Sequence, residues 1–145
     1  MARYTIGVRT GAGSTTLPLM SLYGMVSPPV RGILREVGMF NTTDVEVAVK
    51  LTRLSDLGTP GAGLIESPTD EEVAAASCAG YATHTGAPTL GVDLPYRALL
   101  GAVKGAGVIW TFGDQGLRVR PGKGIGILIA AGIGQALDAY MTWDE

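Results

Sequence analysis

A run of nine residues, Val45-Glu46-Val47-Ala48-Val49-Lys50-Leu51-Thr52-Arg53, has an apolar side chain at every second position from Val45 to Leu51. Polar side chains, those of Glu46, Lys50 and Thr52, lie between the apolar ones. Successive side chains of a β-strand point to opposite faces of its sheet. This period of two therefore predicts a strand with one buried and one solvent-facing side.

The segment before this run, Arg31–Phe40, predicts a second strand with both faces largely covered. Its apolar side chains divide between two faces: Ile33, Val37 and Met39 on one, interrupted by Arg35, and Leu34 and Phe40 on the other. The polar stretch Asn41-Thr42-Thr43-Asp44 between the two strands is typical of a turn. We therefore predict an antiparallel hairpin over residues 33–53.

The C-terminal third repeats the same alternation in four short segments. Their apolar positions are Val108, Trp110 and Phe112; Leu117 and Val119; Ile125, Ile127 and Ile129; and Leu137, Ala139, Met141 and Trp143. Gly113-Asp114-Gln115-Gly116 separates the first two segments, which predicts a second hairpin. The regular alternation of the four aromatic side chains in this region, Trp110, Phe112, Tyr140 and Trp143, favours core packing over a ligand platform.

Short strands separated by glycine and proline are typical of all-β folds. We predict a single domain over residues 1–145, an antiparallel β-sandwich or jelly-roll-like barrel with Gly- and Pro-rich loops and at most one short helix. Residues 1–30 form either part of the sandwich or an extended N-terminal arm plus edge strands. Pro68–Ser77 fits a short helix or a long loop equally well, and Leu94–Val103 favours a strand.

The composition of the chain argues against nucleic acid and membrane partners. The chain has 145 residues, 22 glycines and a formal charge of −2, so it has no basic footprint for a nucleic acid partner. No apolar run is long enough to span a membrane, and the N-terminus lacks the apolar region of a signal peptide. We therefore expect a protein made in the cytoplasm without a membrane partner.

The sequence contains few residues that could act in catalysis or bind a metal ion or a phosphate. The single cysteine, Cys78, and the single histidine, His84, are too few for a usual zinc site. The polar, Thr-rich setting of His84 favours a surface or structural role over a catalytic pair with Cys78 or Ser77. The Gly116–Gly126 segment lacks the spacing of a phosphate-binding loop. Adjacent acids at Glu71-Glu72 and Asp144-Glu145 would point to opposite faces of a strand. We predict no catalytic, cofactor-binding or metal-binding residue, no cofactor and no enzymatic activity.

The order of several motifs resembles a known group of proteins. They are Arg35-Glu36-Val37-Gly38-Met39-Phe40-Asn41-Thr42-Thr43; Leu51-Thr52-Arg53-Leu54 leading into Gly58-Thr59-Pro60-Gly61; Gly107-Val108-Ile109-Trp110-Thr111-Phe112; Val119-Arg120-Pro121-Gly122-Lys123-Gly124-Ile125-Gly126; and Thr142-Trp143-Asp144-Glu145. In this order they resemble the small head decoration, or capsid cement, proteins of tailed phages and prophages. The Pro121–Gly124 stretch is shorter than the corresponding stretch of that family.

The resemblance implies a jelly-roll-like β-sandwich subunit that decorates the outside of a tailed-phage capsid and stabilises its lattice as a homotrimer. The implied partners are further copies of the chain and the major capsid protein, and the implied location is the capsid surface of the virion. Two alternatives remain open. One is another virion component, such as a head–tail, tail or spike-base subunit. The other is a carbohydrate- or ligand-binding sandwich, in which Tyr23, Tyr81 and Tyr96 would have to line a groove.

Overall fold

Residues 1–145 of the computed structural model form twelve β-strands and no helix. The strands are β1 (Arg3–Arg9), β2 (Met20–Gly24), β3 (Gly32–Asn41), β4 (Val47–Leu54), β5 (Gly63–Leu64), β6 (Ser67–Pro68), β7 (Cys78–Tyr81), β8 (Leu90–Leu100), β9 (Gly107–Thr111), β10 (Leu117–Val119), β11 (Gly124–Ala131) and β12 (Leu137–Asp144). The all-β prediction is confirmed. Neither Pro68–Ser77 nor any other segment forms a helix, and none could therefore cross a membrane as one.

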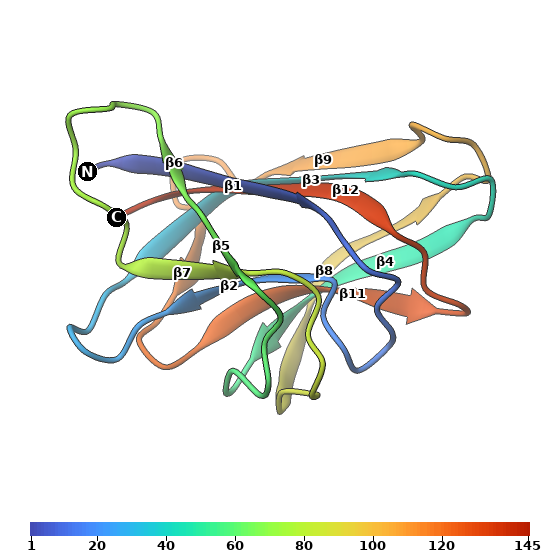
Figure 1. Cartoon of the computed structure of the whole chain (residues 1–145), viewed down its shortest axis with the longest axis horizontal. Coiled ribbons are helices and arrows are strands. Elements are labelled where there is room, and N and C mark those ends of the chain that lie inside the picture. The colour runs from blue at the N-terminus through green and yellow to red at the C-terminus, as the bar shows by residue number, and fades with distance from the viewer.

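The strands form two antiparallel sheets that pack face to face (Figure 1). Sheet A has the order β10-β3-β12-β1-β6, and β9 also pairs with β3. Sheet B has the order β5-β7-β2-β11-β4-β8. Each sheet keeps free edges, so the fold is an open sandwich and the barrel form of the prediction is wrong.

The predicted hairpin over residues 33–53 is wrong. Both strands exist, but β3 belongs to sheet A and β4 to sheet B, so the residues between them cross from one sheet to the other. Alternation in the sequence identifies which face of a strand is buried, and the opposite sheet of the sandwich covers that face. It does not identify the strand's hydrogen-bonded neighbour within its own sheet. The Asn41 side-chain amide holds the crossing by donating to the carbonyls of Val45 (2.6 Å) and Gly101 (3.0 Å).

The second predicted hairpin is also wrong, because β9 and β10 do not pair with each other. Both lie antiparallel to β3 along the same edge, β9 beside Glu36–Phe40 and β10 beside Gly32–Leu34. The chain leaves that edge after Thr111 and returns to it at Leu117. Gly113 and Gly116 both have a φ near +60°, which glycine adopts without the strain that other residues meet.

The predicted assignment of β3 side chains to two faces is correct for the residues after Arg35 and wrong for those before it. The pairing of β3 with β12 shifts by one residue there, since Thr142 lies opposite Glu36 while Trp143 lies opposite Leu34. This β-bulge brings Leu34 onto the same buried face as Val37. An unbroken alternation would have placed them on opposite faces.

Two residue groups show how the space between the sheets is filled. Trp143 is fully buried and stacks on Tyr4, with ring centroids 5.6 Å apart. Trp110 and Phe112, from the edge of sheet A, pack on Tyr96 of β8. Core packing is thus confirmed for these three of the four aromatic residues of the C-terminal third. Tyr140 lies instead on the outer face of sheet A, over Gly38.

The outer face of sheet B is covered by loops. Pro18 lies against Gly126 of β11, and His84 from the loop after β7 bonds to Ser21 of β2. As a result Leu54 and Leu128 are fully buried without belonging to the core between the sheets.

The N-terminal residues 1–30 contribute two interior strands. β1 lies between β12 and β6, and β2 lies between β7 and β11, so neither is the edge strand that one reading of this region expects. The reason is burial: Tyr4, Ile6, Met20 and Leu22 are all part of the core. The strand expected within Leu94–Val103 is present as the longer β8, at the edge of sheet B.

Candidate functional site

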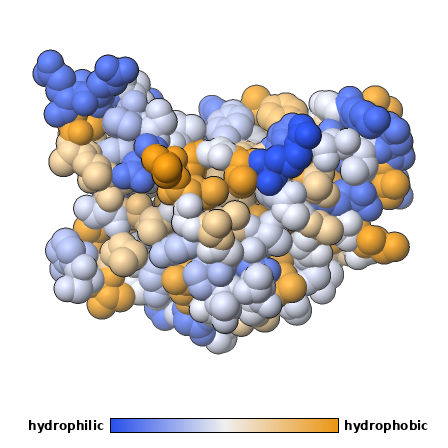
Figure 2. Space-filling view, in the orientation of Figure 1, coloured by the Kyte–Doolittle hydropathy of each residue, from blue (hydrophilic) through white to orange (hydrophobic).

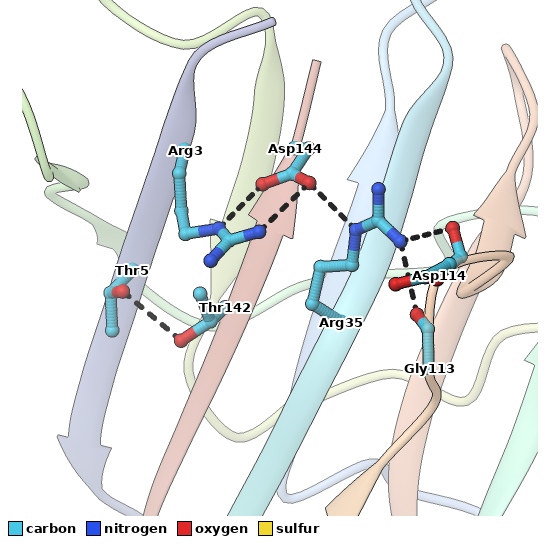
Figure 3. A network of polar contacts seen from close by, with 7 residues as sticks. All are labelled: Arg3, Thr5, Arg35, Gly113, Asp114, Thr142 and Asp144. Atoms are coloured by element: carbon cyan, nitrogen blue, oxygen red, sulfur yellow. Dashed lines mark hydrogen bonds and ion pairs between the residues drawn. The ribbon is translucent and has the colours of Figure 1, made fainter.

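Three surface features bring together groups that could take part in binding. The first is a polar network on the outer face of sheet A (Figure 3). β12 lies between β1 and β3, so an outward side chain of β12 can meet side chains from both neighbours. Asp144 accepts hydrogen bonds from Arg3 Nε (2.7 Å) on one side and from Arg35 Nε (2.6 Å) on the other.

The β-bulge of β3 makes this arrangement possible, because Arg35 is the extra residue that points outward. Its Nη1 also donates to the backbone carbonyls of Gly113 (3.0 Å) and Asp114. Arg35 therefore joins the loop between β9 and β10 to the end of β12. The hydrogen bond from Arg3, with that from Arg35, lowers the pKa of the Asp144 carboxyl, although burial acts in the opposite direction.

A cavity of about 460 Å³ adjoins this network and is lined entirely by polar residues or glycine: Arg3, Arg35, Glu36, Thr111, Gly113, Asp114 and Thr142. Most of its polar groups already have partners. Asp144 binds both arginines, and Glu36 accepts a hydrogen bond from Tyr140 Oη at 2.6 Å. The network consequently fits a structural clamp between strands better than a ligand site.

The second feature is a basic groove between the sheets, with a volume of about 710 Å³. Residues from the end of β4, the start of β8 and the β10 region line it. Four of the lining side chains are cationic: Arg53, Arg118, Arg120 and Lys123. No acidic residue lines the groove, so it has an uncompensated positive charge.

The third feature is an apolar end of the sandwich, formed by the loops 42–46, 101–106 and 132–136, which gather on the right in Figure 1. Asn41 ties the first two loops together, and Thr42 and Thr43 tie the first to the third through Ala136 O (2.6 Å) and Gln135 Oε1 (3.0 Å). Large apolar side chains project from this end into solvent: Val45 (51% exposed), Val103 (65%) and Ile133 (82%).

The residues considered for nucleophilic chemistry lie apart. Cys78 is buried in the core near Gly32 of β3, where burial and the nearby Glu145 raise the pKa of its thiol to about 12. His84 lies under the loops on the other side of sheet B, and burial lowers its pKa while the Leu57 backbone opposes this shift. His84 Nε2 is 2.7 Å from Ser21 Oγ, a contact that no sequence spacing indicates.

The remaining sequence candidates also separate. Asp144 points outward to the arginines, while Glu145 accepts backbone hydrogen bonds from Ser77 and Cys78. The Gly116–Gly126 segment leads through β10 into β11, and no helix N-terminus is there to hold a phosphate. No group of three or more His, Cys, Asp or Glu side chains is arranged to hold a metal ion.

The three tyrosines of the ligand-binding alternative do not form one platform. Tyr23 and Tyr81 lie on neighbouring strands on the outer face of sheet B, while Tyr96 packs between the sheets. Comparison of the chain with described protein families, with curated proteins and with solved structures finds no match.

Proposed function

We propose that the chain is a structural virion protein that decorates or cements the outside of a tailed-phage capsid as a homo-oligomer. Its partners would be further copies of itself and the major capsid protein. The order of motifs between Arg31 and Glu145, which resembles the phage decoration proteins, suggests this role. An antiparallel sandwich is compatible with the jelly-roll-like subunit that the resemblance implies.

The apolar end of the sandwich is the observation that carries the proposal. Hydrogen bonds from side chains hold its three loops in place, yet Val103 and Ile133 remain mostly exposed. Apolar side chains presented by an ordered scaffold favour protein–protein contact, since burying them against a partner releases water without ordering the loops first. Figure 2 shows exposed apolar residues beside charged ones at this end.

The direct test mixes the purified protein with expanded, undecorated phage capsids and with isolated tails, and measures bound protein by co-sedimentation and electron microscopy. We expect stoichiometric, lattice-ordered binding to capsids at about micromolar concentration. Absence of capsid binding at that concentration, or binding to tails alone, would overturn the proposal.

A pair of variants tests whether the apolar end makes the contact. Val103→Asp together with Ile133→Asp would place charges at the interface, and we expect at least about a tenfold loss of capsid affinity. Val26→Asp is the matched control, because Val26 is similarly exposed (62%) and lies outside the three loops. Equal affinities of the two proteins for capsids would exclude the apolar end as the binding surface.

A further inference from the structure

The basic residues of the chain are unevenly paired. Six of them bind a carboxylate within 4.0 Å: Arg3, Arg9, Arg35, Lys50, Arg97 and Lys104. The others are Arg31, Arg53, Arg118, Arg120 and Lys123, and all of these except Arg31 line the basic groove. The unpaired positive charge of the chain is therefore concentrated at one place, although the net charge of the whole chain is −2.

Two of the four groove cations are held in place by hydrogen bonds to backbone carbonyls. Arg53 donates to the carbonyl of Arg118, and Lys123 Nζ donates to the carbonyl of Ser55 at 2.9 Å. Burial, followed by the charge of Arg120, lowers the pKa of Arg53, which is the expected response of a cation that faces another cation. An anion in the groove would relieve this repulsion.

Acidic residues near the groove do not fill this role. Asp56 is close enough for Lys123 to contribute to lowering its pKa, but the two make no ion pair. Its Oδ1 instead accepts hydrogen bonds from the backbone N–H groups of Gly58 and Thr89, both at 3.0 Å. The groove thus lacks an anionic partner within its own chain.

A complementary segment occurs elsewhere in the chain. Asp70-Glu71-Glu72 is the only run of three acidic residues in the sequence, and all three are exposed. None of them makes an ion pair. They belong to the loop between β6 and β7, which extends from the sandwich at the upper left of Figure 1 and forms a hydrophilic protrusion in Figure 2.

This acidic loop is ordered from both sides. Thr69 N donates to the carbonyl of Arg3 at 2.8 Å, and Tyr4 Oη donates to the carbonyl of Ala74 at 2.7 Å. The carboxylates are therefore presented on a backbone that is already fixed, so that binding them costs less conformational entropy than binding a free tail would.

We propose that the acidic loop of one copy of the chain docks in the basic groove of a second copy. The charges match, since three unpaired acids face four unpaired cations, and Val92 and Leu117 add apolar contact along the groove. Because two different surfaces meet, the contact is head-to-tail, and repeating it gives either a closed ring or an open chain of subunits. The inference rests on the self-association included in the proposed function and names a contact for it.

The experiment measures self-association of the free protein by sedimentation velocity at low and high salt, without capsids. We expect association at low salt that weakens as salt is raised, because exposed charges are screened within about 10 Å at 0.1 M salt. Reversing the groove (Arg118→Glu with Arg120→Glu and Lys123→Glu) or the loop (Asp70→Lys with Glu71→Lys and Glu72→Lys) should each raise the dissociation constant at least about tenfold. Each reversed protein alone then has two surfaces of the same charge. Mixing the two reversed proteins should restore association, because the basic reversed loop of one fits the acidic reversed groove of the other, and the two unchanged surfaces also match.

A single chain that carries both reversals provides a second test, since its reversed loop and its reversed groove are again complementary. Combining both reversals in one chain should recover association to within about threefold of the original protein. Arg31→Glu and Glu46→Lys are matched controls, because both residues are exposed and lie outside the groove and the loop, and neither should change association. Circular dichroism verifies that each variant is folded.

Three results would overturn the inference: a monomer at low salt up to about 100 μM, association unaffected by either reversal, or reversals that weaken association without recovery in the combined chain. None of these results bears on capsid binding, which is measured separately with undecorated capsids. Failure of this contact is therefore distinguishable from failure of the proposed function.

Discussion

β11 and β12 are strands of equal length, each with a neighbour on both sides, but their outer faces differ. In β12 (LDAYMTWD) buried and partly exposed residues alternate from Leu137 to Trp143, since its outer side lies on the open face of sheet A. In β11 (GIGILIAA) six consecutive residues are buried, since loops cover the outer face of sheet B. A continuous run of apolar residues and glycine thus indicates a strand that is buried on both faces. Alternation of apolar and polar residues indicates a strand with one solvent-exposed face.

The sandwich therefore has a second, smaller buried layer outside sheet B. Leu128 and Leu54 form part of it together with the Ser21–His84 pair. Sheet A has no such cover, so polar side chains such as Asp144 hold its outer face together. Removing groups from the covered face should therefore cost more stability than removing groups from the open one.

The largest effect is expected for Leu128→Ala. Leu128 is fully buried on the outer face of sheet B, so its truncation leaves a cavity and should lower the free energy of unfolding by about 2 to 5 kcal/mol. Urea denaturation measures this loss. Leu99→Ala is the matched control, because Leu99 is 65% exposed on β8, the edge strand of the same sheet, and its substitution should change the free energy of unfolding by about 0.5 kcal/mol or less. A loss for Leu128→Ala as small as that of the control would mean that the loops do not seal this face.

An intermediate effect is expected at His84, and it depends on pH. Burial lowers the pKa of His84 in the folded state below its ordinary value of 6.5, so the unfolded chain binds a proton more readily. The neutral histidine therefore contributes its full stability above pH 6.5, and this contribution is lost as pH falls toward the folded pKa. The free energy of unfolding should therefore decrease as pH falls from neutral through the ordinary value of 6.5.

His84→Gln removes the titrating group and should flatten the pH dependence in that window. Ser21→Ala leaves His84 Nε2 without its partner and should cost about 1 to 3 kcal/mol at neutral pH. If the original protein and His84→Gln have the same slope of stability against pH, His84 is not protected from solvent as the structure describes.

A smaller effect is expected for Asp144→Asn on the open face. The substitution removes the charge that two arginines share, and it should cost about 1 kcal/mol because Arg3 is half exposed and solvent screens it. The pKa of Asp144 is lowered in the folded state, so this stability is present above the ordinary pKa of 3.8 and is lost as pH falls through the folded value. The difference between the two proteins in thermal or urea unfolding should accordingly vanish in acid.

Arg9→Ala serves as the control for that comparison. Arg9 pairs with Asp138 on the same face, but both side chains are at least half exposed, so the midpoint of unfolding should not change measurably. A loss for Arg9→Ala equal to that for Asp144→Asn would show that the clamp formed with Arg35 adds nothing beyond an ordinary surface pair.

The strands were predictable because alternation reports burial residue by residue. The buried faces of β4 and β12, and the strand character of β8, follow from their own side chains. The pairing was not predictable in the same way. The residues around β3 are compatible with a hairpin to β4, and only the position of the other strands decides that β12 and β9 take the places beside β3.

The candidate surfaces were predictable to an even smaller degree. Arg53 and Arg120 are far apart in the sequence and have no spacing in common, and they meet because the end of β4 and the β10 region lie across a seam between the sheets. The bulge at Arg35, which places it on Asp144, has no sequence signal of its own either. Groups that are brought together by strands from two sheets become visible only when both sheets are placed.

The all-β character of the chain, its short strands, its glycine-rich connections and its core of alternating apolar residues all follow from the amino-acid sequence alone. These properties depend on each residue and its near neighbours, through side-chain alternation and backbone freedom. The choice of strand partners, the burial of the outer face of sheet B by loops, and the clustering of unpaired charges become known only from the three-dimensional arrangement. Those properties depend on contacts between residues distant in the chain, whose free energies belong to the assembled sandwich and to no single segment.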